Sequence, residues 1–236
     1  YAAECEYTLL DEEIHDKYET TKHKYEGAVS DVLGLYDDKG NLKKAGKYVL
    51  NAQDAEKWDK ALERIARTYP SVEWVPATIA RQGSIYDTLR TGLYNLTPPA
   101  LKYFTKEQDN FLKKMEDSGR DDLADKADQI RSAAKEGWRS KKEKELSGSD
   151  TLMIRRYATA VALARKYNVR NAAVNKAIAR LAYFTDIIGD AKMREYVTGA
   201  ADPTDKEKKL DYRDGQYMQT RPGLTAVPPP NGVGIM

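Results

Sequence analysis

Apolar side chains recur every three to four residues along most of the chain, and this spacing predicts helices. The pattern is clearest in the alanine-rich region from Ser149 to Gly199. Its apolar positions fall into two groups separated by Tyr167-Asn168-Val169, where asparagine tolerates the left-handed conformation that ends a helix. We therefore expect one helix capped by Asp150, a short turn, and a second helix that stops at Gly189. Two such helices can approach closely as an antiparallel hairpin.

The residues before this hairpin carry weaker helical patterns that are interrupted by turn-forming residues. The longest predicted helix runs from about Glu6 to Leu35. Its apolar stripe contains Tyr7, Ile14, Tyr18, Thr21, Tyr25, Ala28, Val32 and Tyr36. Further helices are predicted from Asn51, with Asn51 or Asp54 at the start, to Thr68, from Pro76 to about Leu93, from a Thr105 cap to Met115, and from Asp121 to Leu146. Ser147-Gly148-Ser149 then has the composition of a linker.

Alternation of apolar and polar residues, the mark of a strand, is nearly absent, and 48–50 and 72–75 are the only short candidates. The sequence therefore predicts an all-α fold, an irregular bundle of six or seven helices with the alanine-rich hairpin at its centre. We expect a helical region at 1–146, the hairpin and a short helix at 150–213 packed into the same domain, and an extended tail at 214–236.

The tail is rich in proline and glycine, which excludes regular helix. Its prolines favour an extended, partly polyproline conformation that costs little entropy to order, and such segments dock into aromatic-lined grooves. We expect the tail to dock on a neighbouring subunit; the alternative is that it folds back on its own helices. The predicted contact residues are Tyr217, Met218, Arg221, Leu224, Val227, Val233, Ile235 and Met236.

The composition is that of a globular helical protein. Of the 236 residues, 41% are hydrophobic and 32% are charged, which is too apolar for a disordered chain. The 39 basic and 37 acidic residues leave a net charge of +2, which provides no long-range attraction for a polyanion. No apolar run is long enough to span a membrane, which leaves contact with a membrane surface open.

The N-terminal residues bear on location. The chain begins at Tyr1, and Ala2-Ala3 resembles the small-residue context of a signal-peptidase site. Cys5 is the only cysteine, so no disulfide can form within the chain. These features favour a bacterial cell envelope or periplasmic protein over a cytoplasmic one.

Both histidines fall on the first predicted helix, close to glutamates. Glu12, His15, Glu19 and His23 follow at three- and four-residue steps and would share one stripe. Carboxylate-bridged di-iron bundles use Glu-x-x-His pairs, but they need two such pairs and two further glutamates. Here one pair is present, so we interpret the stripe as a solvated helix face. A metal-dependent helical-bundle enzyme is the alternative.

Basic residues in the hairpin raise a second alternative, a nucleic-acid-binding helical module. Arg155, Arg156, Lys166, Arg170 and Arg180 would form a basic strip beside Tyr157 and Tyr167. Binding a duplex usually needs a concentrated positive face, and the local excess is modest. We therefore expect these side chains to cover the alanine-rich core with their aliphatic stems, and we expect no nucleic-acid partner.

No catalytic signature is present. The sequence lacks Gly-x-Ser-x-Gly, the phosphate loop Gly-x-x-x-x-Gly-Lys-Ser/Thr, Gly-x-Gly-x-x-Gly and His-Glu-x-x-His. We therefore predict no catalytic residue, no metal ligand and no cofactor. The expected function is that of a non-enzymatic structural or adaptor subunit of a larger assembly. Its partners would be other protein subunits, including further copies of itself.

Overall fold

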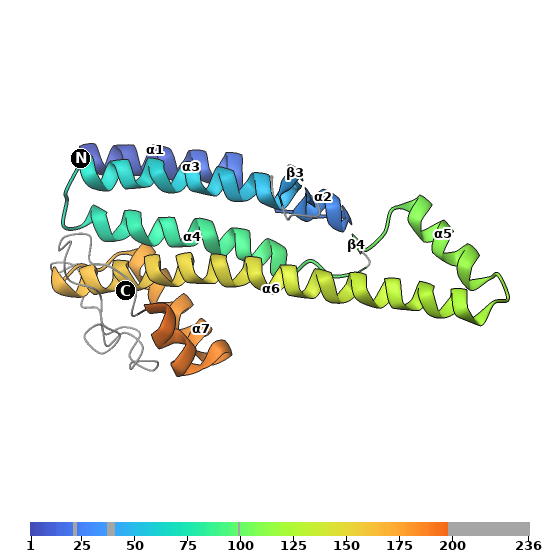
Figure 1. Cartoon of the computed structure of the whole chain (residues 1–236). Coiled ribbons are helices and arrows are strands. Elements are labelled where there is room, and N and C mark those ends of the chain that lie inside the picture. Colours follow the sequence, from blue (N-terminus) through green and yellow to red (C-terminus); the bar gives the residue numbers. More distant parts are fainter. Residues whose placement is uncertain (21–22, 37–40, 99, 198–236) are drawn as a thin grey trace. The chain divides into compact units, whose positions relative to one another are not determined.

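The computed structural model describes residues 1–20, 23–36, 41–98 and 100–197, which form seven α-helices, a π-helical segment and four very short strands (Figure 1). The helices are α1 (Ala2–Ile14), α2 (Val29–Leu33), α3 (Lys47–Thr68), α4 (Trp74–Tyr94), α5 (Lys106–Glu116), α6 (Asp121–Lys166) and α7 (Ala172–Val197), and the π-helical segment η1 (His15–Glu19) continues α1. The strands are β1 (Gly27–Ala28), β2 (Leu35–Tyr36), β3 (Leu42–Lys44) and β4 (Leu101–Lys102). The predicted all-α, multi-helix fold is confirmed.

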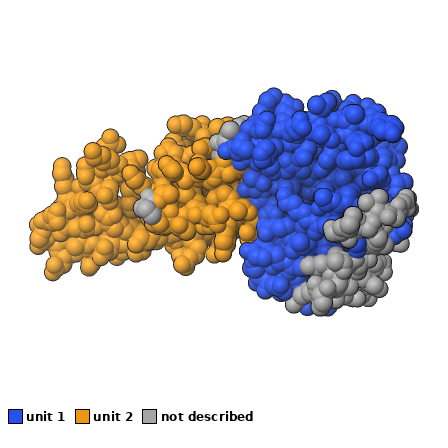
Figure 2. All heavy atoms as spheres, turned by 180° about the vertical axis from the view of Figure 1, so that it is seen from behind, with its two compact units in different colours: residues 1–20, 55–88, 149–236 blue, residues 21–54, 89–148 orange. Residues whose placement is uncertain are grey.

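The chain forms two compact units from interleaved segments, which Figure 2 shows in different colours. Among the described residues, unit 1 contains 1–20, 55–88 and 149–197, and unit 2 contains 23–36, 41–54, 89–98 and 100–148. Helices α3, α4 and α6 contribute residues to both. The units therefore cut across the consecutive regions 1–146 and 150–213 expected from the sequence.

The predicted alanine-rich hairpin forms in unit 1. Helix α6 ends at Lys166, Asn168 adopts the left-handed conformation with φ 56°, and α7 begins at Ala172. Gly189, with φ 81° and ψ 159°, interrupts α7, as the sequence predicted, although helix resumes beyond it. The hairpin residues that are almost completely buried include Ala158, Ala160, Val161, Ala164, Val174, Ala177, Ile178 and Leu181. Four of them are alanines, whose small side chains permit close packing of helices.

Helix α4 is buried on every side within unit 1. All residues from Pro76 to Asp87 are buried, including Arg81, Gln82, Ser84 and Asp87. A helix with one solvated face would place such side chains in water. Here each of them must find a polar partner inside the protein, because an unpaired buried polar group is costly.

Unit 2 contains the strands and the α5 helix. Strand β1 pairs with β4 in parallel, and β2 pairs with β3 in antiparallel fashion. Helix α5 begins as predicted at Thr105, whose hydroxyl accepts a hydrogen bond from the Gln108 amide at 3.3 Å, while the Gln108 side chain accepts one from the Thr105 amide at 3.0 Å. This reciprocal cap satisfies two backbone donors.

The helix predicted from Glu6 to Leu35 is wrong in extent, because α1 and η1 end at Glu19. Several of its apolar positions are nevertheless buried, among them Tyr18, Tyr25 and Val32. Gly27, at φ 104°, begins β1 and departs from helical geometry. The apolar spacing thus identified several core positions, which the chain reaches through separate elements, whereas Tyr36 is exposed.

The predicted linker at Ser147-Gly148-Ser149 is also wrong, because α6 runs without a break from Asp121 to Lys166. Ser149 and Asp150 are buried inside it, so Asp150 is not a helix cap. A single glycine costs a helix only about 1 kcal/mol relative to alanine, which the packing of the neighbouring turns outweighs.

The start of α3 and the candidate strands also differ from expectation. Helix α3 begins at Lys47, so Asn51 lies inside it and donates a hydrogen bond from Nδ2 to the Tyr25 hydroxyl at 3.1 Å. The candidate strand at 48–50 is part of this helix, and 72–75 forms a turn and the beginning of α4.

Helices α4 and α6 meet closely at Gly83. A β-carbon placed on Gly83 would lie 2.6 Å from Cδ1 of the buried Tyr157 ring, well inside contact distance. No other residue type fits here without moving that ring. A β-carbon on Gly137 or Gly148 of α6, by contrast, would meet no neighbouring group of the described residues within 4 Å.

We expect Gly83→Ala to lower the free energy of unfolding by about 1–3 kcal/mol through overpacking against Tyr157. The matched control Gly137→Ala should raise it by up to about 1 kcal/mol, because alanine favours helix and restricts the unfolded chain. Urea denaturation followed by circular dichroism measures both. Equal effects at the two positions would contradict the close contact.

Candidate functional site

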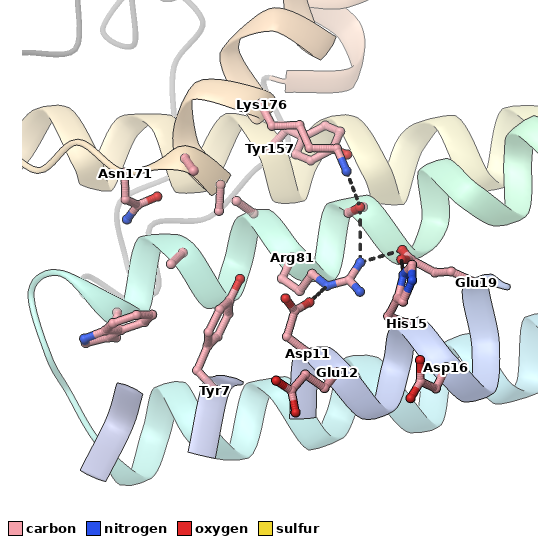
Figure 3. A pocket seen from close by; sticks show the side chains of 16 residues that line it. Tyr7, Asp11, Glu12, His15, Asp16, Glu19, Arg81, Tyr157, Asn171 and Lys176 are labelled. Atoms are coloured by element: carbon pink, nitrogen blue, oxygen red, sulfur yellow. Dashed lines mark hydrogen bonds and ion pairs between the residues drawn. The ribbon is translucent and has the colours of Figure 1, made fainter. Parts of the chain in front are cut away.

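A pocket of about 760 Å³ lies in unit 1, lined by side chains from α1, η1, α4, α6 and the start of α7 (Figure 3). This volume falls in the range of about 300–1,000 Å³ that is typical of small-molecule sites. Its polar and aromatic lining residues are Tyr7, Asp11, Glu12, His15, Asp16, Glu19, Trp74, Arg81, Ser84, Tyr157, Asn171 and Lys176.

Arg81 is the most enclosed charged side chain of this pocket, with 9% of its side-chain surface exposed. Its Nε donates to the Asp11 carboxylate, and its Nη1 donates to Glu19 Oε1 at 2.6 Å and to Ser84 Oγ at 3.3 Å (Figure 3). The guanidinium therefore ties α4 to both α1 and η1. Two carboxylates compensate its charge, as a buried cation requires.

The hydroxyl of Ser84 extends this network towards α6 and α7. Ser84 Oγ accepts a hydrogen bond from Lys176 Nζ at 3.2 Å and is also hydrogen-bonded to the Tyr157 phenol. The phenol in turn donates to Asp87 Oδ2 at 3.2 Å, and Arg180 binds both Asp87 oxygens at 2.6 Å. A continuous polar network thus runs from Asp11 to Arg180 across four helices and η1.

The electrostatic environment of the pocket and this network shifts several pKa values, among them those of Glu19, Tyr7 and Tyr157. Burial would raise the pKa of Glu19, but hydrogen bonding and the charge of Arg81, helped by His15 and Lys176, hold it below its usual value. Burial raises the pKa of Tyr7 to about 12, with Asp11 adding to the effect and Arg81 opposing it. Burial and the charge of Asp87 raise the pKa of Tyr157, so both phenols stay protonated at neutral pH.

The π-helical segment η1 forms part of the pocket wall. It carries three lining residues, His15, Asp16 and Glu19, within five positions. His15 Nδ1 lies 3.4 Å from Glu19 Oε2, whereas Arg81 binds the other oxygen of the same carboxylate. Single π-helical turns are uncommon and occur frequently at functional sites, which supports this pocket as a candidate site.

Two aromatic rings that line the pocket lie against each other. The ring centroids of Tyr7 and Trp74 are 5.2 Å apart, with an interplanar angle of 46°. Both side chains are half-buried and offer apolar surface to a ligand.

The structure brings together three members of the predicted Glu/His stripe. Glu12, His15 and Glu19 line the pocket, but η1 ends before His23, whose Nδ1 lies 3.4 Å from the Tyr25 hydroxyl in unit 2. Glu19 is already bound to Arg81. Across the described residues, no three His, Cys, Asp or Glu side chains are grouped so as to hold a metal ion.

The basic residues considered for nucleic-acid binding do not form one exposed strip. Arg156 pairs with Asp59 at 2.8 Å, and Arg180 pairs with Asp87. Arg170 and Tyr157 are buried. Most of this charge is therefore compensated by carboxylates or enclosed by protein.

A second concavity, of about 350 Å³, lies in unit 2 between α5 and α6, and we call it the α5–α6 groove. It is lined by Phe104, Glu107, Gln108, Phe111, Leu112 and Ile130. Phe111 is 62% exposed and Ile130 is 43% exposed. Only Leu112 of α5 is fully buried.

The predicted contact residues of the tail, Tyr217, Met218, Arg221, Leu224, Val227, Val233, Ile235 and Met236, lie outside the described residues. Sequence reasoning missed Arg81, Ser84 and Asp87. Their signal was polar residues at helical spacing inside an otherwise apolar helix. No helix in the described part of the chain is long and apolar enough to cross a bilayer.

Comparison of the chain with known protein families, with curated proteins and with solved structures found no match.

The Glu19–Arg81 contact predicts a specific pH dependence. The folded pKa of Glu19 lies below its unfolded value near 4.5, so its contribution is complete above that value and is lost as the pH falls below it. We expect Glu19→Gln to lower the free energy of unfolding by about 1.5 kcal/mol at pH 7, and the loss to shrink between pH 5 and pH 3. Denaturation of both proteins across this range measures the difference.

The pH dependence must be taken from the difference between the variant and the wild type, because Asp59 affects the pH dependence of stability with the opposite sign. Burial raises the pKa of Asp59 against the lowering effect of Arg156, so protonation favours the folded state there. Glu4→Gln, which removes a carboxylate from α1 outside the pocket, is the matched control. A Glu19→Gln difference that stays constant down to pH 3 would contradict the assignment.

Proposed function

We propose that this chain is a non-enzymatic structural or adaptor subunit of a larger protein assembly, and that the α5–α6 groove is one of its contact surfaces. The observation that carries the proposal is the exposure of Phe111 and Ile130 on the two sides of one apolar concavity. Exposed apolar side chains that are clustered, rather than scattered, mark protein interaction sites.

The surroundings of the groove support a protein partner. The first part of α6, from Asp121 to Gly148, is largely exposed and highly charged, and of its residues only Ala127 and Trp138 are buried. Ile130 of this segment and Phe111 of α5 are exposed at one groove and together form an apolar patch. An amphipathic helix or an extended segment with apolar anchors would cover it.

The extended arm at 214–236 is the second part of the proposal. Its restricted, proline-rich backbone and spaced apolar residues suit docking on a neighbouring subunit, which would include another copy of this chain. The pairing of the polar residues around Arg81 and Asp87 supports a structural role for them rather than a catalytic one.

The double variant Phe111→Ser/Ile130→Ser should lose its partners, because it removes both exposed apolar side chains of the groove. Truncating central apolar contacts costs an interface about 2 kcal/mol or more, or roughly 30-fold in affinity. Affinity purification of the tagged chain from its source cells, quantified against wild type, measures this. Its melting temperature should stay within about 2 °C, because exposed side chains contribute little to stability.

Leu9→Ser is the matched control, since Leu9 is 67% exposed on α1 and lines neither the pocket nor the groove. It should retain every partner. Unchanged recovery of all partners by the groove variant would exclude the groove as a contact surface.

Deleting residues 214–236 tests the arm separately. We expect the helicity and melting temperature of the monomer to remain nearly unchanged while assembly with partners is lost, measured by circular dichroism and sedimentation velocity. A truncated chain that melts many degrees lower would indicate that the tail folds on its own helices, and one that assembles normally would exclude a docking arm.

A further inference from the structure

The pocket of unit 1 is lined in part by acidic and basic side chains that form no ion pair with described residues. On one wall, the side-chain carboxylates of Glu12 and Asp16 form no hydrogen bond or ion pair with described residues. On another, the ammonium of Lys176 binds the Ser84 hydroxyl but forms no ion pair within the described part of the chain. In Figure 3 these walls come from different elements, α1 with η1 and α7 respectively.

A further donor adds to the positive wall. Nε and Nη1 of Arg81 are engaged, but its Nη2 has no acceptor among the described residues, although the side chain is nine-tenths buried and lines the pocket. This nitrogen is therefore available to donate to water or to a ligand. The first residues of α7 lie on the same side, where the helix dipole also favours negative charge.

The charge balance selects the kind of ligand. Asp11 and Glu19 already compensate Arg81, which leaves Lys176 to attract an anion and Glu12 with Asp16 to attract a cation. A polyamine would meet Lys176, and a dicarboxylate would meet Glu12 and Asp16, so either would face a like charge. A molecule with one ammonium and one carboxylate satisfies both walls.

The aromatic rings of the lining and the volume of the pocket limit what the body of the ligand can be. The Tyr7 and Trp74 rings offer apolar surface to a side chain or hydrocarbon segment. A pocket of about 760 Å³ lies in the upper part of the range for small-molecule sites, which favours a body of several residues over a single amino acid.

We propose that this pocket binds short peptides with free ends. Glu12 and Asp16 would bind the terminal ammonium of the peptide, and Lys176 and Arg81 Nη2 would bind its terminal carboxylate. This goes beyond the adaptor function and uses a different unit of the chain. The peptide is bound without covalent change.

The test uses the full chain and two pooled libraries of tripeptides, one with free ends and one acetylated at the amino end and amidated at the carboxyl end. Affinity selection with mass spectrometry should retain members of the free-ended pool at least tenfold more strongly than their blocked counterparts. A retained peptide is then resynthesised with only one end blocked, and titration calorimetry should show about tenfold weaker binding for each single block.

Substitutions assign the two ends. Glu12→Gln should remove most of the penalty for blocking the amino end, and Lys176→Gln should remove most of the penalty for blocking the carboxyl end. Both side chains are exposed, so both variants should fold, which the melting temperature verifies. Glu4→Gln and Lys60→Gln, exposed residues outside the pocket, should bind peptide as wild type does.

Three results would overturn the proposal: no peptide retained from either pool, equal retention of free and blocked peptides, or end preferences that neither substitution changes. The Phe111→Ser/Ile130→Ser variant should still bind peptide, because its substitutions lie in the other unit. Loss of peptide binding and loss of protein partners are therefore measured independently.

Discussion

Helix α4 imposes the constraint on which unit 1 depends: every residue from 76 to 87 is buried, and several of them are charged or polar. Several of them bind other elements. Arg81 binds Asp11 and Glu19, Gln82 donates to the Asp59 carbonyl of α3 at 2.9 Å, and Asp87 accepts from α6 and α7. Because one unpaired member would leave a buried charge that costs several kcal/mol, these contacts specify which helices surround α4 as well as stabilising them.

The same constraint explains how a pocket persists beside a packed core. Apolar side chains would close such a space, since dispersion and burial favour contact. Here the pocket wall is held by directional bonds, with Arg81 fixed by two carboxylates and Ser84 fixed between Lys176 and Tyr157. Beside this network, the carboxylates of Glu12 and Asp16 form no hydrogen bond or ion pair with described residues. The polar network that stabilises the pocket wall therefore has charged side chains next to it that a ligand could contact.

Sequence reasoning succeeded where local chemistry decides the outcome. Asn168 ended a helix, Gly189 interrupted one, and Thr105 capped one, each through properties of the residue itself. It failed where packing decides. The apolar stripe through Tyr25 marked buried positions but not the departure from helix near Gly27, and Gly148 was taken as a break although its buried neighbours keep α6 continuous. The pocket could not be predicted from the sequence for the same reason. Arg81 and Asp87 bind partners that lie about 60 to 90 positions away in the chain.

Helix α6 has an exposed first part and a buried second part, and different interactions keep the two parts helical. Its second part is alanine-rich and buried, so tertiary packing holds it helical. Its first part buries little and must depend on the high helix propensity of its Ala, Lys, Arg and Glu residues. Starting a helix is costly and extending one is not, so the buried part provides a nucleus from which the exposed part continues. Within unit 2 the exposed part, with α5 against it, keeps Phe111 and Ile130 at a fixed spacing on one apolar groove, which a flexible segment would not do.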